Sequence, residues 1–258
     1  MLFASAAQTL LALARDPKRL GAELGVTMVL HTWTRELHFH PHVHAIVTGG
    51  GLADGDARWV RARRNFLFPV RVMGALFRGK MLAALERATF DLGEIDLHTL
   101  RKKSWIVYAK RPFGGPEQVI RYLGRYTHRV GISNQRFVAM DERGVTFRTK
   151  DGKSVAVAGQ ELLARFVQHV LPPRFVKIRH YGLHAASHAT TRLEIARQRL
   201  TPASAPRELL APDEVIDWRE LLLRLSGIDA RLCPACNELA LVRTELPLAL
   251  SRAPPEAA

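Results

Sequence analysis

The sequence predicts an α+β fold, in which helices pack on an antiparallel sheet. Three observations support this class. Strand-like and helix-like segments follow one another without regular βαβ alternation, two apolar strand candidates follow each other near the N-terminus, and short apolar alternations separated by DERG and KDGK resemble a meander. With 258 residues and 47% hydrophobic content, the chain can also bury a substantial core.

The first half of the chain is predicted to contain three helices and three strands. Helical patterning predicts helices at 5–20, at 69–88 and from 116 to about 129. Runs of β-branched and apolar residues predict strands at 25–34, 42–48 and 104–110. Pro41 predicts a hairpin or irregular edge between the first two strands, because proline cannot donate to a ladder. The glycine-rich segment 49–56 is predicted to be a loop.

The second half is predicted to begin with a β-meander over 136–158. A helix at 159–171, a strand at 174–182, an arginine-rich helical stretch to about 200 and a last helix at 213–226 follow. A linker-like segment at 201–209 divides the chain into a main domain, 1–200, and a region at 201–258 that holds the linker, a helix and a CxxC motif.

The charge of the chain indicates a polyanionic partner. The formal net charge is +14, and arginines are spread along the whole chain. A basic surface on a folded domain most often binds nucleic acid, although a GC-rich genome also favours arginine codons. No apolar run is long enough for a transmembrane helix, so we expect no membrane partner. The two closely spaced cysteines suit a cytoplasmic protein.

Four histidines occupy alternate positions in HFHPHVHAIVTGGG, residues 38–51. Residues i and i+2 of a strand point to the same face, so His42 and His44 are expected to project together. Two neutral imidazoles at this spacing could share a divalent ion, and their binding should weaken as the pH falls. The alternative is a pair of histidines on a solvated strand face.

Two tyrosines lie four residues apart in RYLGRYTHRVGISNQR, residues 121–136. Tyr122 and Tyr126 therefore share one helix face, and a phenol can attack a phosphodiester to form a covalent link with DNA. Beside them runs a row of candidate phosphate-binding residues, Arg121, Arg125 and Arg129. An ordinary apolar stripe packed on the core is the alternative, and a packed helix could still present its hydroxyls to ligands on a sheet.

Three segments, HPHVHAIVTGGGL, YAKRPFGGPEQVIRYLGRYTHRVGISN and RFVKIRHYG, resemble the two-tyrosine HUH transposases of rolling-circle insertion sequences. The resemblance covers about residues 5–185. It implies that 1–200 is a catalytic domain with an HUH-endonuclease-like antiparallel sheet. It also implies that His42 and His44 bind Mg²⁺ or Mn²⁺ and that Tyr122 and Tyr126 are the nucleophiles.

A third metal ligand is expected, and we assign it to His31. This histidine lies on the preceding predicted strand, eleven residues before His42, and some relaxases use a histidine at similar spacing. If the two strands pair, His31 could lie across from the histidine motif. The sequence also offers four rival ligands, Glu36, His38, His40 and Gln118.

The resemblance implies cleavage and rejoining of single-stranded or hairpin DNA at element ends through a 5′-phosphotyrosine intermediate. Candidates for a basic, base-stacking groove are Trp59, Arg61, Arg63 and Arg64, which could equally be a solvated charge run. The competing functions are an inactive DNA-binding remnant and a rolling-circle replication initiator. No phosphate-binding loop of the helicase type occurs in the sequence.

The sequence departs from the family pattern in its cysteines. Members usually carry a cysteine-rich zinc module ahead of the region where this sequence starts, so we expect either a truncated copy or a separate zinc-containing DNA-recognition polypeptide. Cys233 and Cys236 supply two of the four ligands that a structural zinc needs. His184 and His188 could supply the others, but zinc is not expected there.

Overall fold

A computed structural model describes residues 1–53, 55, 58–88, 93, 96–127, 131–149 and 151–200, and the positions 217, 219–220, 222–223, 227, 229–233, 236 and 238; from 125 to 127 it describes the backbone alone. The chain divides into two units, Met1–Ala205 and Pro206–Ala258, and the elements below belong to the first. The domain boundary predicted at 200/201 stays a prediction.

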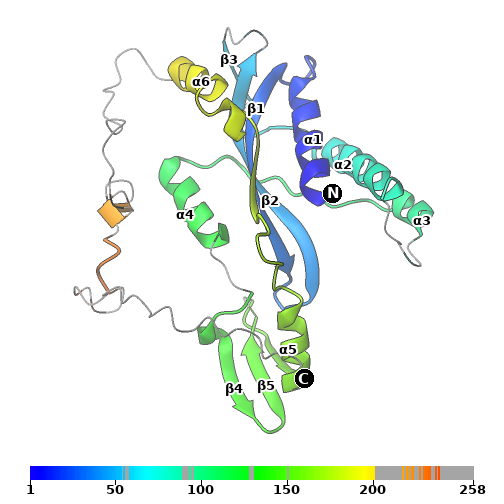
Figure 1. The fold of residues 1–258 in the computed structure, drawn as a ribbon, viewed down its shortest axis with the longest axis vertical. Helices are drawn as coiled ribbons and strands as arrows, with labels where there is room; N and C mark the ends of the chain where they lie inside the picture. The colour runs from blue at the N-terminus through cyan, green and yellow to red at the C-terminus, as the bar shows by residue number, and fades with distance from the viewer. Residues whose placement is uncertain are drawn as a thin grey trace, which may run out of the picture. The chain divides into compact units, whose positions relative to one another are not determined.

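A four-stranded antiparallel sheet carries the fold, and with the helices around it confirms the α+β class (Figure 1). Its strand order is β3-β2-β1-β7. The four strands are β1 (Ala22–Trp33), β2 (Phe39–Ala53), β3 (Trp59–Arg61) and β7 (Ile178–Gly182). The long hairpin of β1 and β2 is its centre, which matches the two strands predicted from β-branched patterning.

The register of this hairpin places His31 directly opposite His42. Beyond that pair the register shifts, and Trp33 lies opposite Phe39. The extra residue of β2 falls at His40 and Pro41, where proline's missing N–H costs no ladder bond. The irregularity predicted from Pro41 is thus confirmed as a bulge within the strand.

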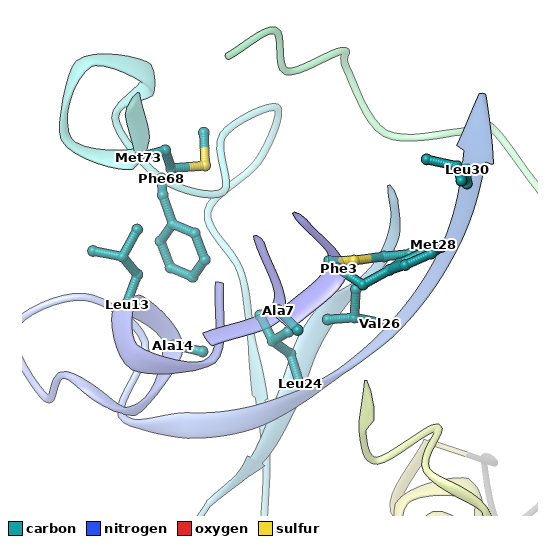
Figure 2. Packing of buried hydrophobic residues seen from close by; sticks show 10 residues of the cluster. All are labelled: Phe3, Ala7, Leu13, Ala14, Leu24, Val26, Met28, Leu30, Phe68 and Met73. Carbon is teal, nitrogen blue, oxygen red and sulfur yellow. The ribbon is translucent and has the colours of Figure 1, made fainter. Parts of the chain in front are cut away.

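One face of the sheet packs on α1 (Leu2–Arg15), and α2 (Val70–Glu86) packs on α1 and adds Met73 to the same apolar core. In Figure 2, Val26 and Met28 of β1 lie beside Phe3 of α1, and Phe68 lies near Leu13. Each large apolar side chain buried here contributes about 1.5–3 kcal/mol. Because side chains alternate along a strand, this packing leaves the opposite face of β1 and β2 for polar residues.

The other elements among the described residues of the unit are four helices and a second sheet. The helices are α3 (Leu97–Lys102), α4 (Pro116–Thr127), α5 (Gly159–Val167) and α6 (Arg192–Leu200), with 3-10 turns at Asn134–Arg136 and Ala186–His188. The second sheet has the order β4-β5-β6, with bounds Phe137–Asp141, Gly144–Arg148 and Ser154–Val157. The predicted meander is confirmed.

Two predictions for the first half are wrong. The glycines at 49–51 lie inside β2 rather than in a loop. Gly50 and Gly51 permit close pairing with the neighbouring strands, since added Cβ atoms there would lie 2.4 Å from the carbonyl oxygens of Val60 and Glu23. Segment 104–110 forms no strand. Its side chains alternate in burial, but its backbone has no ladder partner among the described residues.

The second half also differs from the prediction in places. Residues 183–191 form turns and a 3-10 helix, and the helix begins only at Arg192. The segment 201–209 lies outside the described residues, as does most of 213–226. Among the residues that are described, no helix has both the length and the apolar character that crossing a membrane requires.

Candidate active site

Three histidines meet on the polar face of the main sheet. His31 of β1 and His42 and His44 of β2 each place a ring nitrogen so that the three nitrogens lie within 4.8 Å of one another. His31 is buried, and the other two are half-buried. The antiparallel register causes this meeting, since it sets His31 against His42 and leaves His44 one strand period away on the same face.

The ring of His31 is held from its own strand. It stacks on Trp33 with ring centroids 4.8 Å apart and an interplanar angle of 15°. Its centroid lies 4.4 Å from that of His44 and 5.6 Å from that of His42. The third ligand that the sequence predicted is therefore the one that the fold brings to the pair.

A backbone hydrogen bond defines the tautomer of neutral His42. Nδ1 of His42 lies 2.8 Å from the carbonyl oxygen of His40. A carbonyl oxygen only accepts, so Nδ1 donates the hydrogen and Nε2 keeps the lone pair. Such an outer hydrogen bond orients a metal-ligating histidine and makes it more basic.

The tyrosine helix α4 reaches the same group. The Tyr122 hydroxyl oxygen lies 3.0 Å from Nδ1 of His44. The Tyr122 ring also contacts Phe113 edge-to-face, with centroids 5.2 Å apart. The Tyr122 ring packs while its hydroxyl reaches the histidines. This arrangement is compatible with both predictions for Tyr122, the nucleophile and the packed apolar stripe.

The other predicted residues of α4 are described less fully. Arg121 donates to Glu117 Oε1 from two guanidinium nitrogens, at 3.1 and 2.6 Å, and more than half of its side chain is exposed. Tyr126 and Arg125 lie in the helix, but their side chains are outside the described part, and Arg129 is outside it altogether. Their roles stay predictions.

Glu36, His38 and His40 lie outside the three-histidine group, and Gln118 as a ligand stays a prediction. Glu36 and His38 are exposed and 3.6 Å apart in the turn between β1 and β2. The His40 ring is 5.2 Å from that of His42 but adds no nitrogen to the group. Gln118 Oε1 accepts from the backbone N–H of Gly114 at 2.8 Å, which ties the start of α4 to the segment before it.

A second polar cluster on the same face was missed in the sequence. Nδ1 atoms of His180 and His184 each lie 3.0 Å from the Thr27 hydroxyl. Burial, with a smaller contribution from nearby His180, lowers the pKa of His184. The sequence held one sign of this cluster: Thr27 lies four positions before His31, so the two side chains share a face of β1.

Lys177 adds a cation beside the histidines. Its Nζ lies 5.4 Å from the centroid of the Trp33 ring that stacks on His31. Partial burial lowers the pKa of this ammonium group. The Trp33 ring therefore links a metal-ligand candidate to a positive charge.

The residues suggested for a basic groove lie at the β3 edge. Trp59 is half-buried and packs against the cluster of Leu52 and Leu183, and its role in base stacking stays a prediction. Arg61, Arg63 and Arg64 are exposed. Cys233 is half-buried and Cys236 exposed. DNA contact at the arginines and the expected lack of zinc at the cysteines both stay predictions.

The donor set fits a divalent transition ion. Bonds of about 2.0–2.2 Å place neighbouring ligand atoms about 3–3.5 Å apart, so the nitrogens need to close in from their spread of up to 4.8 Å. Side-chain rotations can supply such a shift. Neutral imidazoles favour transition ions over Mg²⁺, which prefers oxygen ligands.

Comparison with known proteins agrees with the motifs. Residues 25–192 match a family described as "Putative transposase". The chain is 40% identical over 270 residues to "Putative transposase y4qJ" of Sinorhizobium fredii (strain NBRC 101917 / NGR234), covering 95% of this chain and 67% of that protein. It is 29% identical over 235 residues to "Transposase for insertion sequence element IS801" of Pseudomonas savastanoi pv. phaseolicola, covering 82% of this chain and 55% of that protein. No solved structure matches.

Proposed function

The chain belongs to the two-tyrosine transposase family, and we propose that it cleaves and rejoins single-stranded DNA through a 5′-phosphotyrosine link. One observation carries the proposal: the Tyr122 hydroxyl lies 3.0 Å from a histidine of the three-histidine group. The candidate nucleophile and the candidate metal site are thus adjacent. The chain spans about two thirds of one curated relative and 55% of the other, so the activity of the whole protein is part of this proposal.

The three histidines are proposed to hold a divalent ion, with Mn²⁺ a better match to their nitrogens than Mg²⁺. A bound ion would supply Lewis-acid polarisation of the scissile phosphate. His42 would be oriented by its hydrogen bond to the His40 carbonyl, and His31 by its stack on Trp33.

Tyr122 is proposed as a nucleophile. Its phenol oxygen forms a new bond to the phosphorus while the bond from phosphorus to the 3′ oxygen breaks. The phenol loses its proton to solvent, and the departing 3′ oxygen gains one to become a free hydroxyl. The His44 contact holds the phenol oxygen in place for this attack. The phosphotyrosine bond conserves the free energy of the phosphodiester bond that was broken, so rejoining needs no external energy source.

Tyr126 is proposed to receive the second DNA end, because it follows Tyr122 by one helical turn on α4. Arg121, Arg125 and Arg129 are proposed to bind phosphates next to the tyrosines. The Arg121–Glu117 pair is exposed, and such pairs are worth about 0.2–1 kcal/mol, so a phosphate can replace the carboxylate. The proposed substrate is single-stranded or hairpin DNA at element ends.

The test is covalent capture of DNA. The purified chain is incubated with labelled single-stranded DNA from the flanks of its own gene, with Mn²⁺ or with chelator, and resolved on a denaturing gel. We expect a metal-dependent protein–DNA band that His42→Ala removes. Tyr122→Phe and Tyr126→Phe should each weaken the band and together abolish it, because each removes one phenol nucleophile.

The control is Tyr181→Phe, which changes a partly buried tyrosine packed on the opposite, apolar face of the sheet. It should leave the band intact. A band that survives chelation, or survives loss of both Tyr122 and Tyr126, would contradict the mechanism. Salt-sensitive DNA binding without any band would identify a DNA-binding protein that lacks the reaction.

A further inference from the structure

We infer that residues 104–113 form a track for single-stranded DNA that leads to Tyr122, with Tyr108 and Phe113 stacking on bases and Lys110 and Arg111 binding phosphates. The inference rests on the proposed function, because it assigns a path to that substrate. The segment joins α3 to α4 (Figure 1). It was predicted to be a strand and forms none.

The start of the segment is anchored to the core side of the fold. The Trp105 ring contacts Phe77 of α2 edge-to-face, with centroids 5.6 Å apart, and its Nε1 donates to the Leu100 carbonyl at 3.1 Å. A Cβ on Gly74 would lie 2.7 Å from the Trp105 carbonyl oxygen, so α2 approaches this backbone closely. Val107 packs on the core cluster of the main sheet.

The residues that alternate with these anchors project outward. Ile106 is 94% exposed and Tyr108 is 79% exposed. Trp105 and Val107, which alternate with them, are half-buried, so burial alternates along this segment although it forms no strand. The Tyr108 ring therefore gains little from burial, whereas an exposed aromatic face is what an unpaired base stacks on.

The end of the segment joins this aromatic surface to the nucleophile. Lys110 and Arg111 are both exposed, and neither forms an ion pair with any described residue. Phe113 is 38% exposed and its ring touches that of Tyr122, with centroids 5.2 Å apart. The Gly114 N–H bond to Gln118 holds this end against α4.

Single-stranded DNA matches this set better than a duplex does. Two aromatic rings that flank two cations can stack on bases and bind the phosphates between them, but a duplex keeps its bases stacked and paired. From Tyr108 to Phe113 the chain spans at most about 17 Å. The net charge of +14 further favours a polyanion at these two cations.

The first test measures non-covalent affinity by fluorescence anisotropy in chelator, so that no cleavage is needed. The probes are a labelled single strand from the flanks of the gene and the same sequence as a duplex. Tyr108→Ala should weaken single-strand binding about fivefold or more and leave duplex binding unchanged. Tyr108→Phe keeps the ring and should bind like the wild type. Met140→Ala, which alters an 82% exposed side chain on β4, is the matched control.

The second test locates the contact. A series of single strands with one abasic nucleotide each should contain a position that weakens wild-type binding but adds no further loss in Tyr108→Ala, because both changes remove the same stack. Lys110→Gln and Arg111→Gln should each reduce the salt slope of single-strand binding by about 0.7, while Arg143→Gln in the β4–β5 turn should not.

Equal single-strand affinities for wild type and Tyr108→Ala would overturn the track, as would equal losses on single strand and duplex. These outcomes are separate from failure of the proposed function. A metal-dependent covalent band, together with unchanged single-strand affinity in Tyr108→Ala, would support the nuclease and contradict the track. Single-strand binding that depends on the Tyr108 ring, without a covalent band, would support the track and contradict the proposed reaction.

Discussion

Gly25 shapes the polar face of the sheet through the absence of a side chain. A Cβ at this position would lie 2.4 Å from Cδ2 of His184, inside the space that the imidazole occupies. The ring can therefore lie over β1 and reach the Thr27 hydroxyl. A side chain at this single position would collide with the His184 ring where it lies beside Thr27.

Gly25→Ala should lower the free energy of unfolding by about 1–3 kcal/mol, because it overpacks the site of the His184 ring. Urea denaturation measures the change. Gly49→Ala in β2, where an added Cβ meets nothing within 4 Å, is the control and should be near neutral. In the double variant Gly25→Ala/His184→Ala, part of the loss should return. A Gly25→Ala chain as stable as Gly49→Ala would contradict this account.

His184 should make stability depend on pH. Burial, and to a lesser extent nearby His180, holds its pKa below the ordinary 6.5, so the unfolded chain takes up its proton first as the pH falls. Stability from this group is complete above pH 6.5 and is lost as the pH falls through the window below it. Urea unfolding from pH 7.5 to 5.5 should show a smaller decline in His184→Gln than in the wild type. Identical declines would remove His184 as the cause.

At the scale of elements, the tip of the β1–β2 hairpin connects the two sheets. Leu37 has no exposed surface and shares a cluster with Ile132 and Phe147. It sits in the left-handed region, with φ 63°, at a cost of about 1–2 kcal/mol that burial of its side chain, worth about 1.5–3 kcal/mol, offsets.

Polar contacts from other elements also hold this tip. Arg136 donates to the Arg35 carbonyl at 2.7 Å, and Arg165 of α5 donates to the Glu36 carbonyl at 2.9 Å. The hairpin that carries the histidines is therefore clamped at the end near His38. We expect the clamp to position the second sheet rather than to form the histidine group.

Leu37→Ala should cost about 2–5 kcal/mol, because it leaves a cavity where the tip enters the second sheet's core. Hydrogen exchange read by mass spectrometry should show the loss of protection mainly in β4, β5 and β6, with β1 less affected. Leu163→Ala, which truncates a 63% exposed leucine of α5, is the control. Uniform loss across both sheets would mean that they unfold as one unit.

At the scale of the whole molecule, metal binding and folding should be coupled. His31 and His42 are separated by eleven residues and meet only when the hairpin forms, so the unfolded chain lacks the site. A ligand that binds the folded state alone stabilises it by mass action. The same coupling gives a readout of the site that needs neither DNA nor turnover.

Mn²⁺ at about 100 times its Kd should add about 2.7 kcal/mol of stability, or roughly 5–10 °C in Tm for a domain of this size. Thermal unfolding with and without chelator measures this. His31→Ala should abolish the increase, whereas His38→Ala, which changes an exposed histidine outside the group, should retain it. An undiminished increase in His31→Ala would exclude that residue as a ligand.

Local patterning in the sequence was enough to predict much of this molecule. The helices α1, α2 and α4, the hairpin strands and the meander follow from periodicity and turn residues, which act over a few positions. His42 and His44 share a face for the same reason. The motifs that they form with Tyr122 and Tyr126 also identified the family, which the comparisons confirm.

Strand pairing, by contrast, was decided only by the tertiary structure. Gly50 and Gly51 look like loop residues until the neighbouring strands come within reach of their missing Cβ atoms. Residues 104–110 look like a strand but find no ladder partner among the described residues. His31 joins the pair because the register places it opposite His42. Ladder partners and register are contacts between distant parts of the chain, so no local pattern could specify them.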